Sequence, residues 1–271
     1  MTNINRPNNK IKGNANNNRI VGTKRRDAIK SGAGDDRVSA SGNRDRTFGE
    51  NGDDFIFGSQ GRDGLFGGAG DDKIVGGGAN DRLLGRGGNN NLNGGKGDDK
   101  LIGGVGDDVL FGRGKRDRLK GHNGNDYLRG GNGRDSLFGG RGNDRLYGGN
   151  ANDRLFGAGG DDLLYGGKGY DFINAGAGDD LIEGGFGNDL LRGGGGADTF
   201  VFSLLKGGTG RDVILDFSGA DSLKIAGFNL GSGDTIIQTG KNTFLFTDVQ
   251  SGTNLTLVAS NGLDLTNANF V

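Results

Sequence analysis

A nine-residue period constrains this chain more than any other feature. From Gly13 to Val201, 189 consecutive residues divide into 21 units of the form Gly-Gly-x-Gly-x-Asp-x-Leu-x, without insertion or deletion. The segments Gly67–Val75 and Gly103–Phe111 are clean copies of this unit. A fixed short period predicts that each unit is one structural element stacked on its neighbours.

The glycines and the apolar residues of the unit predict its local structure. Three glycines in nine residues exclude a helix, because each costs about 1 kcal/mol relative to alanine there. Glycine serves where φ must be positive or where backbones approach closely. Position eight is apolar in 20 of the 21 units, Thr47 being the exception. We therefore predict a tight turn over the first six residues and a very short strand over the last three, with position eight pointing inward.

Stacking of such strands predicts an all-β fold, a right-handed parallel β-roll (β-solenoid) with two nonapeptides per turn. Two parallel sheets would enclose the position-eight side chains, and a glycine turn would lie at each edge. Each apolar residue contributes about 2 kcal/mol, whereas ordering costs about 1–2 kcal/mol for every residue. The thin core therefore needs a further source of stability.

Position six of the unit is Asp in 19 copies, and Asn18 and Asn90 are the exceptions. Stacked turns would place each carboxylate above the one two nonapeptides away, and such like charges repel unless a cation lies between them. Carboxylates and turn carbonyls, in a chain without Cys, form an all-oxygen environment that suits Ca²⁺ better than Zn²⁺ or copper. A lone Asp in such a turn would be an ordinary turn residue, but phased repetition indicates ligation. The candidate calcium ligands are Asp27, Asp36, Asp45, Asp54, Asp63, Asp72, Asp81, Asp99, Asp108, Asp117, Asp126, Asp135, Asp144, Asp153, Asp162, Asp171, Asp180, Asp189 and Asp198.

The unit resembles the calcium-binding nonapeptide of the RTX (repeats-in-toxin) family over about 70% of the chain. The resemblance implies the β-roll fold, several bound Ca²⁺ ions, and ligation by the position-six Asp with backbone carbonyls from the glycine turns. It also implies export in an unfolded state through a type I secretion channel, followed by folding outside the cell.

The net charge of −1 has a specific meaning in a chain whose aspartates are expected to bind cations. Once calcium neutralises the Asp columns, the outer surface would be basic. Solubility and intramolecular pairing are the ordinary explanation. An anion-binding face for lipopolysaccharide, acidic polysaccharide or lipid headgroups is the sharper one, and its candidates are Arg82, Lys100, Arg113, Lys115, Arg116 and Arg118. A nucleic-acid partner is not expected, because no binding motif accompanies the charges.

The period divides the chain into a short polar segment (1–12), the repeats (13–201) and a C-terminal segment (202–271). The last segment is expected to be a β-rich cap and, by resemblance to the segment after the repeats in secreted relatives, to carry the type I signal. Short strands are expected at 213–217, 222–225, 235–238, 243–247, 255–258 and 270–271. The N-terminus has no apolar core of a signal peptide, and no 18-residue apolar run is present. We expect a secreted or cell-surface protein without a cleaved N-terminal signal peptide.

No catalytic residues are predicted. The chain has one His, His122, and lacks the H-E-x-x-H and G-x-S-x-G patterns. In the resembling family, catalysis resides in a domain that precedes the repeats, and here twelve residues precede them. The expected function is therefore a calcium-folded structural, matrix or cell-surface component. The alternative is a secreted effector that acts on membranes or binds anionic polysaccharide.

Overall fold

The computed structural model describes residues 9–203, 210–226, 235–240, 243–248 and 253–259. Two compact units divide the chain, Met1–Gly140 and Arg141–Val271. Regular structure in the described residues consists of β-strands alone. This part of the chain accordingly has no helix long and apolar enough to cross a bilayer.

The first unit is a parallel β-solenoid whose strands alternate between two sheets. One sheet has the order β1-β3-β5-β7-β9-β11-β13 and the other β2-β4-β6-β8-β10-β12-β14. The strands are β1 (Asn9–Lys12), β2 (Arg19–Val21), β3 (Asp27–Ala33), β4 (Arg37–Ser39), β5 (Arg46–Asn51), β6 (Phe55–Gln60), β7 (Gly64–Ala69), β8 (Lys73–Gly78), β9 (Arg82–Gly87), β10 (Asn91–Lys96), β11 (Lys100–Val105), β12 (Val109–Gly114), β13 (Arg118–Asn123) and β14 (Tyr127–Asn132).

The second unit repeats this architecture and adds an antiparallel hairpin. Its sheets have the orders β17-β19-β21-β23-β27-β26-β25 and β16-β18-β20-β22-β24. The strands are β16 (Arg145–Asn150), β17 (Arg154–Gly159), β18 (Leu163–Lys168), β19 (Phe172–Ala177), β20 (Leu181–Phe186), β21 (Leu190–Gly195), β22 (Thr199–Ser203), β23 (Gly210–Ile214), β24 (Ser222–Ala226), β25 (Thr235–Gly240), β26 (Thr243–Asp248) and β27 (Thr253–Ala259). The strand β15 (Ser136–Arg141) contains the boundary between the two units.

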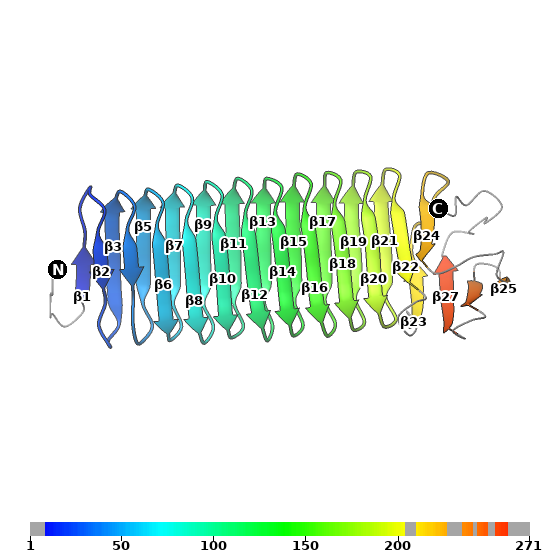
Figure 1. Cartoon of the computed structure of the whole chain (residues 1–271), viewed down its shortest axis with the longest axis horizontal. Coiled ribbons are helices and arrows are strands. Elements are labelled where there is room, and N and C mark those ends of the chain that lie inside the picture. Colours follow the sequence, from blue (N-terminus) through cyan, green and yellow to red (C-terminus); the bar gives the residue numbers. More distant parts are fainter. Residues whose placement is uncertain (1–8, 204–209, 227–234, 241–242, 249–252, 260–271) are drawn as a thin grey trace. The chain divides into compact units, whose positions relative to one another are not determined.

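The register confirms the prediction of two nonapeptides per turn. Leu92 of β10 pairs with Leu110 of β12, and Leu101 of β11 pairs with Leu119 of β13, so each leucine meets the one two nonapeptides later. Figure 1 shows consecutive strands of each unit running in opposite directions, with turns along two edges. Odd- and even-numbered nonapeptides therefore form separate turn columns on opposite edges.

Position-eight side chains form the core, as the apolar pattern predicts. From Ile56 to Phe200 every position-eight side chain is 0% exposed. Thr47 occupies the same place, and its Oγ1 is buried without a hydrogen-bond partner. The core is therefore continuous within each unit but only one side chain deep per nonapeptide.

The strands are longer than the sequence pattern predicts. Instead of three residues, most of them span six, from position seven of one nonapeptide to position three of the next, as in β8 (Lys73–Gly78). Position-one glycines such as Gly76 are extended and buried beside position eight. The expectation of a six-residue turn is thus wrong, because positions one to three lie within the strand and only positions four to six turn.

Left-handed backbone occurs at two positions of the nonapeptide, one in the turn and one near the end of the strand. Position four is left-handed at Gly97 (φ 140°) and at the non-glycine residues Ala79 (φ 73°) and Lys115 (φ 74°). Position two is left-handed as well, including at Arg86 (φ 96°) and His122 (φ 92°). The carbonyl of the preceding turn restricts position four, since a Cβ on Gly97 would overlap the oxygen of Ala79. Both glycine positions therefore serve backbone conformation and close stacking.

Ala79 and Gly97 stand at the same turn position in successive even-numbered nonapeptides, and replacing each by the other residue tests this account. Ala79→Gly should stabilise the calcium-loaded protein by about 0.5–1 kcal/mol, since relief of left-handed strain exceeds the entropy cost of glycine. Gly97→Ala should destabilise it by about 2 kcal/mol or more, because strain and a carbonyl clash combine. Urea denaturation measures both changes, and equal effects of the two substitutions would contradict the assignment.

The solenoid pattern extends beyond the 21 predicted units. At the beginning, β1 pairs with β3 and aligns Asn9 with Asp27, and Ile11 is buried. At the end, β21 pairs with β23 and β22 with β24 at an offset longer than two nonapeptides, as in Leu191 with Ile214 and Phe200 with Leu223. A short insertion thus interrupts the period without ending the sheets.

The C-terminal strands lie close to their predicted places. Strands β23 to β27 overlap the five expected between residues 213 and 258, and the strand expected at 270–271 lies outside the described residues. Strand β27 pairs in parallel with β23, and β25, β26 and β27 pair antiparallel in succession. The assignment of residues 202–271 to a cap remains a prediction.

Candidate metal sites

Every one of the nineteen position-six aspartates is buried. Each is at most 3% exposed. Each lies at or directly before the beginning of a strand. Isolated buried carboxylates cost several kcal/mol. A series of them requires compensation from hydrogen bonds, protons or cations.

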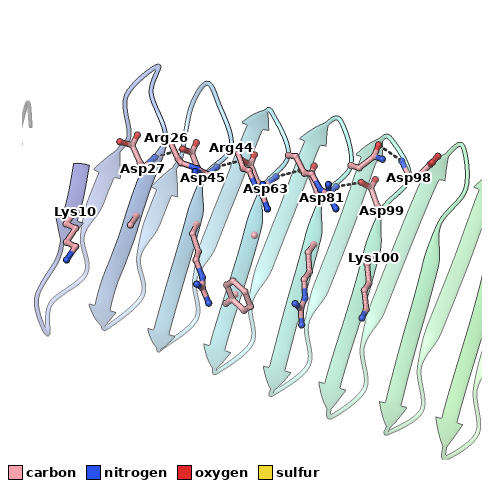
Figure 2. A pocket seen from close by; sticks show the side chains of 17 residues that line it. Lys10, Arg26, Asp27, Arg44, Asp45, Asp63, Asp81, Asp98, Asp99 and Lys100 are labelled. Carbon is pink, nitrogen blue, oxygen red and sulfur yellow. Dashed lines mark hydrogen bonds between the residues drawn. The ribbon is translucent and has the colours of Figure 1, made fainter. Parts of the chain in front are cut away.

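One oxygen of these carboxylates obtains its compensation from the backbone. The N–H of Asp63 donates to Oδ1 of Asp81 at 2.7 Å, and the N–H of Asp81 donates to Oδ1 of Asp99 at 2.7 Å (Figure 2). The same bond links Asp45 N–H to Asp63. These bonds run between successive turns and set the carboxylates in a column along each edge.

In most of these carboxylates the other oxygen, Oδ2, has no hydrogen-bond donor. Buried polar atoms in proteins are nearly always satisfied, so repeated exceptions at one position of the repeat indicate a missing positive partner. Such orphaned Oδ2 atoms belong to Asp36, Asp45, Asp54, Asp63, Asp72, Asp81, Asp99, Asp108, Asp117, Asp162, Asp171, Asp180, Asp189 and Asp212.

The position-one glycines leave room for these oxygens. A Cβ on Gly76 would overlap Asp81 Oδ2 and would lie 2.6 Å from the carbonyl oxygen of Gly94. A Cβ on Gly58 would lie 2.6 Å from Asp63 Oδ2 and 2.6 Å from the carbonyl oxygen of Gly76. Carboxylate and carbonyl oxygens therefore gather at a place that only glycine keeps open.

Burial raises the pKa of many of these carboxyl groups far above the ordinary value of 3.8. The pKa reaches about 8 for Asp81 and Asp117 and about 7 for Asp45 and Asp171. Desolvation is the main cause, the backbone N–H donor opposes it, and neighbouring carboxylates raise the pKa further. Without a cation, ionisation of these buried aspartates at pH 8 therefore destabilises the folded form.

This shift predicts that acid favours the folded form of the metal-free chain. A carboxyl group with a pKa near 3.8 when unfolded and 6–8 when folded contributes stability below pH 4, which is lost as the pH rises through 6–8. Metal-stripped protein should show more β-structure by far-UV circular dichroism at pH 4.5 than at pH 8. Sedimentation controls for aggregation, and a decline of the soluble β signal on acidification would contradict the prediction.

The donor set fits a hard cation. In the described residues no three carboxylate or imidazole side chains converge on one point, so an ion in these columns must also take backbone oxygens. The orphaned Oδ2 atoms and the carbonyls beside the position-one glycines supply them. Ca²⁺ accepts six to eight oxygen ligands in flexible geometry, and the columns therefore meet its requirements.

Sequence reasoning missed two members of the columns. Asp212 is fully buried, accepts the N–H of Asp189 at 2.9 Å and has a pKa of about 8. Asp221 accepts the N–H of Asp198 at 3.0 Å. The signal was present, because each is followed by an apolar residue two positions later, as in the repeats. The longer offset at this end of the repeats hid both from a strict nine-residue period.

The predicted anion-binding residues do not form one cluster. Arg82 and Lys100 line a common groove, whereas the other four lie outside its lining. Arg113 lies over the ring of Phe111 at 4.7 Å, and Arg118 lies over a phenylalanine ring at 5.2 Å. The register nevertheless places Arg82, Lys100 and Arg118 side by side at the start of β9, β11 and β13, and anion binding by the six residues remains a prediction.

Comparison with known proteins gives a family match over most of the chain. The family model of the RTX calcium-binding nonapeptide repeat matches residues 12–47, 48–83, 84–119, 102–137, 111–146, 138–173, 165–200 and 204–224. None of the curated proteins compared with the chain matches it.

Among solved structures, the chain matches the crystal structure of the extracellular lipase LipA from Serratia marcescens. The sequence identity is 20%, and the TM-score is 0.23. The match covers 80% of this chain and 38% of the lipase chain.

Proposed function

Because the chain belongs to the family of RTX calcium-binding nonapeptide-repeat proteins, we propose that it is exported from its cell and folds outside when it binds calcium. It carries several calcium-binding repeats, since the family model matches again and again between residues 12 and 224. In the folded form it acts as a structural, matrix or cell-surface component.

The orphaned Oδ2 atoms are the observation that carries this proposal. Their carboxylates are buried, ionised at a cost, and arranged once per nonapeptide. The nineteen position-six aspartates, together with Asp212 and Asp221, are the proposed side-chain ligands, and carbonyls beside the position-one glycines complete each site. A calcium ion supplies the positive charge that makes these buried carboxylates favourable. Folding is thereby coupled to the calcium concentration.

The C-terminal segment 202–271 is the proposed cap and export signal. Strands β27, β26 and β25 extend the sheet beyond β23 in the second unit, which supports a capping role because an open solenoid edge invites pairing with other chains. Type I secretion machinery is the proposed partner during export.

The absence of a catalytic role is also part of the proposal. The only His of the chain, His122, is exposed at a left-handed position near the end of β13. The buried titratable groups of the repeats are aspartates placed identically, once per nonapeptide, which fits repeated ligation better than a single reaction centre.

Expression in a Gram-negative host with a type I secretion channel tests the proposal. The full chain should reach the medium or the cell surface, resist protease at millimolar calcium, and be digested in chelator. Removal of residues 202–271 should abolish export. A chain that remains in the cytoplasm in a folded, protease-resistant form would contradict the proposal.

A further inference from the structure

A basic groove of about 820 Å³ lies on the first unit. Figure 2 shows it beside the column of Asp27, Asp45, Asp63, Asp81 and Asp99. Two rows of cationic side chains line it, one from the turns and one from the beginnings of strands. The volume is within the range of ligand-binding sites.

The turn row consists of Arg26, Arg44 and Arg62, which are exposed at position five of three successive turns. In many other turns this position holds Asp or Asn, whose side chain accepts the N–H of the next turn, as Asp35 Oδ1 does from Asp53 N–H at 3.0 Å. Arginine has no acceptor and cannot make this bond. The three arginines therefore give up a stabilising contact between turns, which indicates a role other than folding.

The strand row consists of Lys10, Arg46, Arg82 and Lys100, all exposed at position seven on β1, β5, β9 and β11. Strand β7 between them has Gly64 at this position. Gly64 has no positive φ, and the atoms nearest to a Cβ there would be the Phe66 ring, at 3.4 Å, and one carbonyl oxygen at 3.9 Å. No backbone requirement explains this glycine, and its effect is to keep the groove open.

The cations of the groove are not neutralised by salt bridges. Ion pairs of the described residues include Lys30–Glu50 and Arg192–Asp216, and neither of these involves a cation of the groove. Arg46 lies over the rings of Phe48 and Phe66 at 5.0 and 5.5 Å, which fixes its guanidinium in place. Since calcium would compensate the buried aspartates beneath, the exposed charge of the groove is positive, although the lining also contains the exposed carboxylate of Asp98.

We propose that this groove binds a linear acidic polysaccharide with about one carboxylate or sulfate per sugar. Successive turns repeat every 4.8 Å or so, and one sugar ring of an extended chain advances by a similar distance. The charges of such a chain would meet the arginines turn by turn. Arginine favours carboxylate and sulfate groups, because its planar guanidinium can bind two of their oxygens at once.

The shape of the groove disfavours other polyanions. Single-stranded nucleic acid binds through aromatic platforms for its bases, but Phe66 is half-buried under Arg46. A flat lipid surface would meet only one row well, because the turn row lies at an edge of the unit and the strand row lies on a sheet. A slender, flexible polyanion engages both rows.

Calorimetric titration of the calcium-loaded full chain with defined probes tests the inference. Polygalacturonate and dextran sulfate are the carboxylated and sulfated probes, and neutral dextran is the control. Either acidic probe should bind, neutral dextran should not, and the tighter acidic probe identifies the source of the charge. The affinity should fall steeply with salt.

Matched variants locate the site. Arg44→Gln with Arg62→Gln should weaken binding at least tenfold, and Gly64→Phe should do so by obstruction, without a change of charge. Arg19→Gln with Arg37→Gln removes two exposed cations from the other sheet and should change affinity less than twofold. If the circular dichroism spectrum of either groove variant differs from that of the wild type, the single change Arg82→Gln replaces that variant. Its affinity for the acidic probe should fall at least threefold.

Three outcomes would overturn the inference. The first is an equal loss in the Arg19/Arg37 control, which would indicate diffuse attraction. The second is tighter binding of single-stranded DNA or anionic vesicles with the same dependence on the groove. The third is self-association through the groove in place of polysaccharide binding. None of these measurements depends on export, so failure here would leave the proposed secretion and calcium-coupled folding untouched.

Discussion

In excess chelator at neutral pH the chain should lose most of its β-structure and regain it cooperatively when calcium is added. The core contributes one apolar side chain per nonapeptide, whereas each turn buries carboxylates whose pKa is raised to about 6–8. At pH 7.5 the unfolded chain ionises these groups freely, whereas the folded form must either hold them as unfavourable ions or keep them protonated unless a cation is present. Calcium at a hundredfold excess over Kd adds about 2.7 kcal/mol per site, and many such sites act together.

Far-UV circular dichroism during a calcium titration measures this effect. Magnesium should substitute poorly, because it requires tight octahedral geometry and retains its waters. Sodium chloride at equal ionic strength controls for general screening. A chain with the same β signal in chelator as in calcium would show that the core and the hydrogen bonds suffice.

Removing one carboxylate from the middle of a column should be the most damaging single change. Asp81 accepts the N–H of Asp63, and its Oδ2 is orphaned beside Gly76. Because each proposed ion lies between successive turns, Asp81→Asn should weaken two sites. The calcium-loaded protein should lose up to about 5 kcal/mol, twice the linkage contribution of one site.

The control is Asp98→Asn, which removes the same charge from an exposed position-five side chain. Its Oδ1 accepts only a 3.2 Å bond from Arg116 N–H, so the stability should change by less than about 0.5 kcal/mol. The reciprocal change Asn90→Asp should add a ligand and raise the number of bound ions measured by equilibrium dialysis. Equal effects of the Asp81 and Asp98 substitutions would contradict the proposed ligation.

The repeating positions of the chain could be predicted from the sequence because each carries one dominant physical demand. Position eight must be apolar to be buried, and position six must be Asp or Asn, so Leu110 and Asp108 have the burial and register that the pattern predicts. Structural requirements that arise from neighbouring turns could not be predicted in this way. The pattern did not reveal that Gly76 is extended within a strand, since its requirement comes from Asp81 and Gly94.

The basic groove escaped prediction for a related reason. Arg26, Arg44 and Arg62 stand two nonapeptides apart from one another and look like scattered variable residues along the chain. Only the alternation of turns between two edges brings them into one row, and only the sheet order adds Arg46 and Arg82 beside them. Auditing odd and even nonapeptides separately at position five would have found the row.

The alternation of edges also limits how such a chain can change its length. Duplicating or deleting two nonapeptides adds or removes one whole turn. Every remaining nonapeptide then stays on its own edge, because residues two nonapeptides apart pair with each other. A step of one nonapeptide within the groove would exchange the edges beyond it and divide the arginine row between the two edges. We therefore expect gene duplication within these repeats to proceed in steps of two nonapeptides, so that the copy number keeps its parity while the protein grows.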